Sequence, residues 1–315
     1  MPVEPMPTGE YRMVTQRAFD YGVTEDPHAP RDDAGSVGDY RLLCMLLGTL
    51  IGAGIASLSF KLADSPAERD QWLIFLLIAG LLGAAAGEAF GFGMSRWFEV
   101  QQYHSIKRWR VTLSVVMVLI IAAALIASTN YVFANKETLT SRGIALSALA
   151  IAGGLPTAAT LAAIKQVCAD PLPGGPGAQL SAMLRLRQMS TRMLSQLGVL
   201  VLLIMGVNGA AANWGDIQQN PKVVIFSGVV ASFIIAIMYV PTASALRRRG
   251  AIFVGRHFSL ADTPTDQLAS AAEDRQKLEK MLGLDQTTFG ELKAGFVVLT
   301  PVVVGLVATL LKAGV

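Results

Sequence analysis

Charge is scarce in this sequence. Only 16% of its 315 residues are Asp, Glu, Lys or Arg, whereas soluble domains average about 25%. Hydrophobic residues make up 52% of the chain, and the mean hydropathy is +0.48. This balance excludes an ordinary soluble domain and indicates that lipid is the main solvent of the folded chain.

Cysteine and histidine are also rare. The two cysteines, Cys44 and Cys168, form neither a disulfide framework nor a metal-binding spacing. The three histidines, His28, His104 and His257, lie in three different polar segments, and none is one helical turn from another. A zinc site needs several such ligands together, so we predict no metal and no cofactor.

Recognisable catalytic motifs are missing as well. Nothing matches a phosphate-binding loop, a dinucleotide fingerprint, a zinc-protease helix or a nucleophile elbow. Ser95, His104 and Cys168 are only scattered candidates for a nucleophile or base, so we predict that the chain is not an enzyme. The net charge of +3 is spread along the chain without a basic run interleaved with aromatic residues, and nucleic acid is therefore not an expected partner.

Long apolar runs are what the sequence does contain. A membrane-spanning helix needs about 20 apolar residues. Six runs reach that length and a seventh is shorter but almost purely aliphatic; a re-entrant segment is the alternative for the seventh. We therefore predict an all-α polytopic membrane helical bundle of about seven spans with short cytoplasmic helices, over 40–60, 72–94, 111–133, 143–164, 194–213, 223–246 and 294–311.

The positions of tryptophan, lysine and arginine support these spans. The four tryptophans fall at or just beyond predicted ends, where the headgroup region favours them. Of the 26 Lys and Arg residues, twenty fall in connections on one side of the membrane and six on the other. The positive-inside rule then places the N-terminus in the cytoplasm and the C-terminus outside, in a bacterial-type inner or plasma membrane. The first apolar run follows almost forty polar residues, so we expect no cleaved signal peptide.

The polar segments define four regions. Residues 1–38, with five prolines and few aliphatic side chains, have the composition of a disordered cytoplasmic tail, or of a docking peptide that orders on a partner. Residues 39–246 form the six-span membrane bundle, and 294–315 the seventh membrane helix. Residues 247–293 are predicted to be a cytoplasmic helical hairpin whose helix begins near Thr263 and stops at Gly283. It is too small for a core of its own and must pack on other cytoplasmic segments or on a neighbouring subunit.

Two cytoplasmic features are candidates for a partner surface. A helix over 178–213 would be about 54 Å long, so part of it must project from the bilayer or bend along it. Methionines at helical spacing are usually ordinary packing, and a partner groove is the alternative. The candidate partner residues on this helix and on the hairpin are Met183, Met189, Met193, Leu268, Leu278 and Met281.

Basic residues at the cytoplasmic ends of the spans are candidates for contact with anionic lipid. The segment 95–110 is short, aromatic and basic, which favours an interfacial connection on the inner leaflet. Each basic residue near an anionic surface would contribute about 1 kcal/mol. Simple anchoring of the topology is the alternative reading of the candidate residues, which are Arg96, Lys107, Arg108, Arg110, Arg247, Arg248 and Arg249.

Glu88 is the only ionisable residue well inside a predicted span, about 10 Å from its inner end. A carboxylate at that depth usually faces a bundle interior or a water-filled cavity. We consider Glu88 and Asn208 a candidate ion or proton site. The alternative is a structural carboxylate that is hydrogen-bonded to another helix or reaches cytoplasmic water near Arg96. Small-residue pairs such as Gly48 with Gly52 and Gly83 with Gly87 predict close helix crossings nearby.

Two functions fit these observations. The first is a non-catalytic integral membrane subunit or scaffold that assembles through its membrane helices and its cytoplasmic hairpin. It would contact anionic lipid and, on the cytoplasmic face, a second copy or another protein. The second is an ion channel or small-solute or proton transporter that uses Glu88. A coupled transporter usually needs several polar groups at mid-depth, and a single buried carboxylate is fewer than that. This observation favours the first function.

Overall fold

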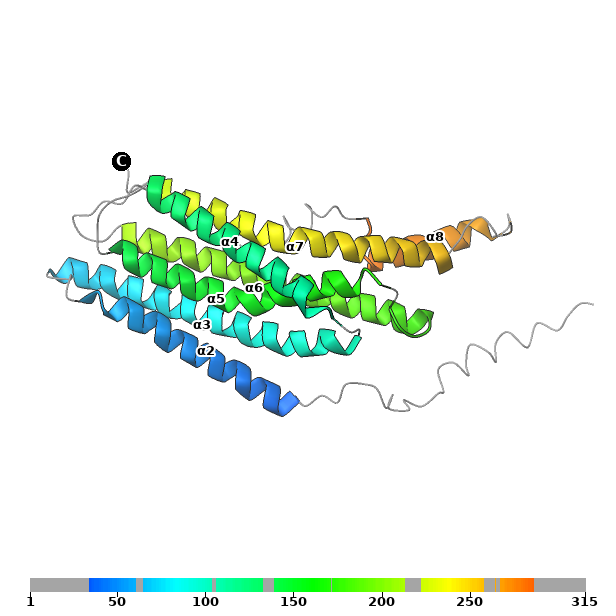
Figure 1. Ribbon diagram of the computed structural model, residues 1–315, viewed down its shortest axis with the longest axis horizontal. Helices are drawn as coiled ribbons and strands as arrows, with labels where there is room; N and C mark the ends of the chain where they lie inside the picture. The colour runs from blue at the N-terminus through cyan, green and yellow to red at the C-terminus, as the bar shows by residue number, and fades with distance from the viewer. Residues whose placement is uncertain are drawn as a thin grey trace, which may run out of the picture. The chain divides into compact units, whose positions relative to one another are not determined.

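The computed structural model describes residues 34–60, 65–103, 106–132, 139–170, 172–212, 222–257, 264 and 267–285. All contacts below lie within Gly38–Val315, the second of the two units into which the chain divides. Every regular element in the described part is a helix, which confirms the all-α prediction (Figure 1). The helices are α2 (Ala34–Ser57), α3 (Pro66–Tyr103), α4 (Arg108–Val132), α5 (Leu139–Val167), α6 (Pro176–Ala212), α7 (Lys222–His257) and α8 (Leu268–Met281).

Five of these helices, α2, α3, α5, α6 and α7, are long and apolar enough to cross a membrane. They cover the first, second, fourth, fifth and sixth predicted runs. Helix α4 covers the third run but is not among the five, and several of its side chains lie outside the described part. The seventh run, 294–311, also lies outside the described residues. Five apolar helices are therefore established, and the count of seven spans is not.

Three helices are much longer than a bilayer is thick. Helices α3, α6 and α7 contain 38, 37 and 36 residues. At 1.5 Å per residue each is about 55 Å long, whereas the hydrocarbon core is about 30 Å thick. Helix α6 confirms the predicted long helix over 178–213. About 25 Å of each helix, summed over its two ends, therefore exceeds the thickness of the apolar layer.

The ends of α3 and α7 correct the sequence analysis. We expected an interfacial connection over 95–110, but α3 continues to Tyr103 and only 104–107 separate it from α4. Helix α7 continues through Arg247–Arg249 to His257, so the first residues of the predicted hairpin region 247–293 belong to the same helix as the sixth run. In both places hydropathy falls because the helix leaves the apolar layer. Helical hydrogen bonds need no apolar side chains, so the backbone continues.

Glycines bring α2 and α3 into backbone contact. A methyl group on Gly48 would overlap the carbonyl oxygen of Gly83, and one on Gly87 would overlap that of Cys44. The predicted close helix crossing is thus confirmed between these two helices. On another side of α3, the backbone of Gly93 lies against Pro156 and Thr157 of α5.

Threonine hydroxyls add hydrogen bonds between the packed helices. Thr157 Oγ1 donates to the carbonyl of Ala89 at 3.2 Å, and Thr160 Oγ1 donates to that of Gly93 at 3.0 Å. Thr242 of α7 donates to Leu161 of α5 at 2.9 Å. All three threonines are fully buried. These bonds tie α5 to both neighbours close to Pro156, which lies inside the helix.

Buried side chains form two hydrophobic clusters. The first, which we call the membrane core, is rich in alanine and is drawn from the five apolar helices; its largest members include Phe75, Leu82, Phe92, Leu146, Leu161 and Met193. The second, which we call the extension core, joins the projecting ends of the long helices to α8. Its members include Val100, Ile164, Val167, Cys168, Met183, Leu186, Met189, Val254, Leu278 and Leu282.

Helix α8 packs on the projecting part of its own chain. Its last turn ends at Gly283, which has a φ of +63°, and the amide of Leu284 donates to Glu279 O at 2.9 Å. This is a glycine-terminated Schellman cap, which confirms the predicted stop. Arg187 Nη1 of α6 donates to Met281 O at 2.8 Å, so a cation also satisfies the helix C-terminus. At the other end, α8 begins after Gln267 without a side-chain cap. The predicted start at Thr263 lies outside the described residues.

Candidate functional site

Glu88 is part of an ion pair between α2 and α3. The backbone contact at Gly48, Gly83 and Gly87 holds the two helices close enough for Arg41 to reach Glu88. Arg41 Nη2 lies 2.9 Å from Glu88 Oε1. Gln196 of α6 is the second partner and donates from Nε2 to the same oxygen at 3.4 Å. The carboxylate therefore links three helices.

The structure does not bring Glu88 and Asn208 together. Gln196 marks the level of Glu88 on α6, and Asn208 lies twelve residues further along the helix, or about 18 Å. Glu88 has the interhelical partners of a structural carboxylate, although 42% of its side chain is exposed. The two residues do not form the shared polar site that the sequence suggested.

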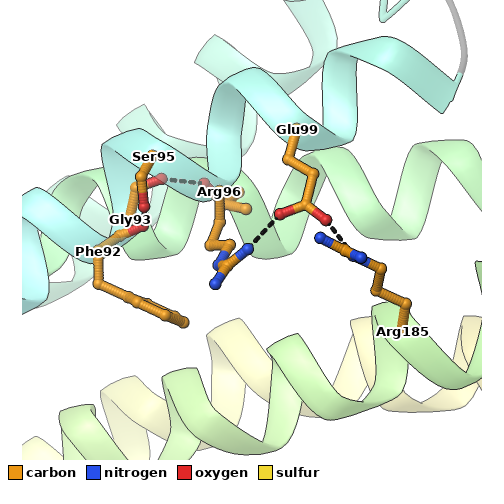
Figure 2. A network of polar contacts seen from close by, with 7 residues as sticks. Phe92, Gly93, Ser95, Arg96, Glu99 and Arg185 are labelled. Carbon is orange, nitrogen blue, oxygen red and sulfur yellow. Dashed lines mark hydrogen bonds and ion pairs between the residues drawn. The ribbon is translucent and has the colours of Figure 1, made fainter. Parts of the chain in front are cut away.

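A second carboxylate, which sequence reasoning did not single out, lies further along α3. Glu99 accepts from Arg96 on its own helix and from Arg185 of α6 (Figure 2). Only 11% of the Glu99 side chain is exposed, whereas Arg185 is 44% exposed. Glu99 therefore fastens the projecting part of α3 to the projecting part of α6.

Phe92 lies between these two ion pairs. Its ring is 1% exposed, and three guanidinium groups lie near it. The guanidinium carbons of Arg41, Arg96 and Arg192 are 5.3, 5.2 and 5.0 Å from the ring centroid. These distances fit cation–π contacts, which are strongest where water is excluded. We call the whole group the Phe92 cluster: Arg41, Glu88, Phe92, Arg96, Glu99, Arg185, Arg192 and Gln196.

The Phe92 cluster carries more positive than negative charge. The cluster has four arginines and two carboxylates: Arg41 pairs with Glu88, and Arg96 and Arg185 share Glu99. The Nε atoms of Arg41 and Arg96 are buried without a hydrogen-bond partner among the described residues. A group of this kind can attract and orient an anion.

The scattered catalytic candidates are engaged in other ways. The hydroxyl of Ser95 donates to the carbonyl of Phe92 at 2.8 Å. Burial raises the pKa of the Cys168 thiol to about 12, an effect that the charge of Arg249 opposes. That thiol remains protonated, and so weakly nucleophilic, at neutral pH. His104 lies outside the described residues. Within the described part, no group of three His, Cys, Asp or Glu side chains could hold a metal ion.

The candidate partner residues fall into two sets. Met183, Met189 and Met193 are 2%, 5% and 0% exposed, so they belong to the chain's own packing and present no surface. On α8, Leu278 is buried and Leu268 is half-buried. Met281 is 56% exposed, and it is the member of the set that faces outward most.

The candidate lipid-contact residues also differ in exposure. Lys107, Arg108 and Arg110 are exposed beside Trp109, which is 75% exposed. Arg96 instead lies within the Phe92 cluster.

In the last third of α7, Arg248 is exposed, whereas Arg247 and Arg249 are half-buried. Arg249 lines a shallow cavity of about 240 Å³ together with Gln179, Ile252, Phe253, Arg256 and His257.

Sequence reasoning missed most of the Phe92 cluster. Arg41 and Arg192 were counted only as charges near span ends, and Phe92 was counted only as apolar. Two local signals could have been found, because Arg96 follows Phe92 by four residues and precedes Glu99 by three on one helix. The polar contacts between helices join residues 47 to 108 positions apart, which no local pattern reveals.

Comparison with known protein families, curated proteins and solved structures finds no match for this chain.

Proposed function

We propose that this chain is a non-catalytic integral membrane subunit or scaffold, with its N-terminus in the cytoplasm, in a bacterial-type inner or plasma membrane. It assembles with a second copy or another protein through its membrane helices and its cytoplasmic helices. The proposal rests on a contrast between two parts of the molecule. The described membrane part gathers few polar groups, whereas the ends of the long helices and α8 form a part that projects beyond the apolar layer.

The membrane part offers little for transport. Its one deep carboxylate, Glu88, is held by Arg41 and Gln196, and Asn208 lies about 18 Å along α6 from that level. The buried threonines are used in bonds between helices. A coupled transporter usually needs several polar groups together at mid-depth, and the described residues do not gather them.

The projecting part offers a platform. On one side of the apolar runs α6 extends by about 27 Å, α7 by about 17 Å and α3 by about 14 Å. Helix α8 packs against these extensions through Leu278 and Leu282. The opposite face of α8 is exposed and charged, with Glu273, Asp274 and Lys277 directed to solvent. A charged helical surface on one side of a membrane favours the approach of a protein with complementary charge.

The membrane helices also have outward apolar faces. Leu42, Leu46 and Leu50 of α2 are 56%, 60% and 68% exposed, and α4 exposes Met117 and Ile120 in the same manner. Such faces are stable only against lipid or against another apolar helix. They are the surfaces through which the membrane helices would assemble.

Site-specific crosslinking in intact membranes tests assembly. A photoreactive residue replaces Met281 on the exposed face, and the matched control places it at buried Leu278. We expect a discrete crosslinked species from position 281, identified by mass spectrometry as a second copy or a defined protein, and none from position 278. Crosslinks from position 281 to lipid alone, with a monomer in native mass spectra, would reject the assembly proposal.

The alternative is an ion channel or small-solute or proton transporter, and the exposure of Glu88 favours testing it. With 42% of its side chain accessible, Glu88 can be reached by an ion or a small solute if the pair with Arg41 opens. Purified protein is reconstituted in vesicles carrying a pH-sensitive dye, and the Glu88→Gln variant is compared. The scaffold proposal expects no flux above protein-free vesicles; flux that Glu88→Gln abolishes would establish transport instead.

A further inference from the structure

The Phe92 cluster contains a cation whose charge no carboxylate of the cluster balances. Arg41 has Glu88, and Arg96 has Glu99, which Arg185 shares. Arg192 is exposed, and its contact within the cluster is the face of the Phe92 ring at 5.0 Å. An exposed guanidinium beside two others attracts an anion from the surroundings, because like charges at this separation repel unless a counter-charge is present.

The three guanidiniums are held close together. Each guanidinium carbon lies within 5.3 Å of one ring centroid, so any two are separated by no more than about 11 Å. They come from three different helices, α2, α3 and α6. The buried ring restricts the guanidinium groups, and this reduces the entropy lost when their N–H donors bind a ligand.

Their depth indicates the source of the anion. Arg41 begins the apolar run 40–60, Arg96 follows the run 72–94, and Arg192 precedes the run 194–213. All three therefore lie where an apolar layer gives way to polar surroundings, the level of phospholipid headgroups. A phosphate group has the charge and the oxygen spacing for bidentate binding by arginine. A soluble phosphate has the same chemistry, but nothing would concentrate it at this level.

We propose that Arg41, Arg96 and Arg192, seated on Phe92, form a binding site for the headgroup phosphate of an anionic phospholipid. Arg192 makes the main contact, because it is exposed and its charge is not already paired within the cluster. Arg41 and Arg96 raise the local positive potential while keeping their pairs with Glu88 and Glu99. This site is independent of the scaffold proposal and would exist in a transporter as well.

Lipid titration of the full-length protein tests the site. The protein in neutral detergent is titrated with phosphatidylglycerol, and binding is followed by native mass spectrometry and by thermal midpoint. Phosphatidylcholine and inorganic phosphate are titrated in parallel. We expect saturable binding of phosphatidylglycerol, a weaker response to phosphatidylcholine, and none to millimolar phosphate. An equal response to inorganic phosphate would overturn the assignment to lipid, and an equal response to phosphatidylcholine would overturn the anion site.

Arginine variants locate the binding. Arg192→Gln should raise the Kd for phosphatidylglycerol about tenfold, the usual effect of losing a charge-assisted hydrogen bond. Lys165→Gln removes one positive charge from an exposed position directly after the apolar run 143–164 and should leave the Kd unchanged within about twofold. If both variants weaken binding equally, the attraction is general surface electrostatics and the proposed site does not exist.

A lysine variant separates charge from geometry. Arg192→Lys keeps the positive charge but loses the planar donor group that lies over Phe92. We expect an affinity between those of the wild type and Arg192→Gln. Full affinity in the lysine variant would show that charge alone suffices and would overturn the role of the Phe92-seated guanidinium.

Discussion

The membrane core and the extension core share long helices but are packed by different means. In the membrane core, α2 and α3 touch through glycines, and α5 is tied to its neighbours by threonine hydroxyls. In the extension core, the contacts are made by leucine, valine and methionine side chains, with Arg185 and Arg187 bound at its edge.

The difference follows from the solvent on each side of the boundary. In lipid, an apolar side chain gains nothing by leaving its surroundings, so helices associate through close backbone approach and interhelical hydrogen bonds. In water, the transfer of large apolar side chains into a core is itself favourable. Helix α3 therefore changes its mode of packing along its length, from glycine contacts with α2 to the buried Val100 side chain in the extension core.

The largest effect is expected where backbones touch. Gly48→Leu would push α2 away from α3, because even a methyl group overlaps the Gly83 carbonyl. We expect a loss of about 3 kcal/mol or more, measured by unfolding in mixed detergent micelles. Gly54→Ala is the matched control in the same helix, since nothing lies within 4 Å of that position. It should be neutral or stabilising by up to about 1 kcal/mol. Equal losses would mean that the crossing is not tightly packed.

A large effect is also expected in the extension core. Leu186 is fully buried there, and Leu186→Ala should cost about 2–5 kcal/mol through lost burial and the cavity it leaves. The buried Cys168 thiol reports the opening, because maleimide labels it only after the extension unfolds. We expect labelling at a lower urea concentration in the variant. The control is Leu113→Ala in α4, where the side chain is 49% exposed. Unchanged labelling of Leu186→Ala would contradict the assignment of this core.

A smaller effect is expected at the end of α8. Arg187→Gln removes the cation that binds the Met281 carbonyl at 2.8 Å. We expect a loss of about 1 kcal/mol, confined to α8 and its contacts. Hydrogen–deuterium exchange should become faster in α8 while α2 and α3 are unchanged. Faster exchange throughout the chain would instead mean that Arg187 supports the whole bundle.

The smallest effect is expected from the surface pair on α8. Lys277 lowers the pKa of Glu273 by a hydrogen bond, and Glu273 raises the pKa of Lys277. The glutamate contributes stability above its ordinary pKa of 4.5, and this contribution disappears as the pH falls through the lowered value. Because both side chains are well exposed, Glu273→Gln should leave the thermal midpoint at pH 7 almost unchanged. A drop as large as that of Arg187→Gln would show that the pair is not merely on the surface.

The sequence was most informative where length and composition decide the structure. Six apolar runs became helices, α6 has the expected length, and Gly283 ends α8. The glycine pairs correctly predicted a close crossing, although not which helices cross. These properties follow from local hydropathy and backbone conformation, which a single segment contains.

The Phe92 cluster was less predictable than the helices because its contacts join residues that are far apart in the sequence. The contacts of Arg41 with Glu88 and of Arg185 with Glu99 join positions 47 and 86 residues apart. Arg96 and Arg247–Arg249 were placed just beyond the ends of apolar runs, and hydropathy alone cannot show that the helix continues past such an end into polar surroundings. The methionines of α6 recur at helical spacing, and this spacing is the same whether they face a partner or the chain's own core. Only the fold distinguishes the two cases.

The continuity of α3 and α6, whose only prolines stand at their first residues, has a mechanical consequence. Each is a helix of about 55 Å, and the ion pairs at Glu99 join the two near their projecting ends. A tilt of about 5° around the membrane end of such a helix displaces its far end by about 5 Å, close to one helical turn. A displacement of the projecting end is therefore transmitted to the apolar part of the same helix without an intervening loop or proline.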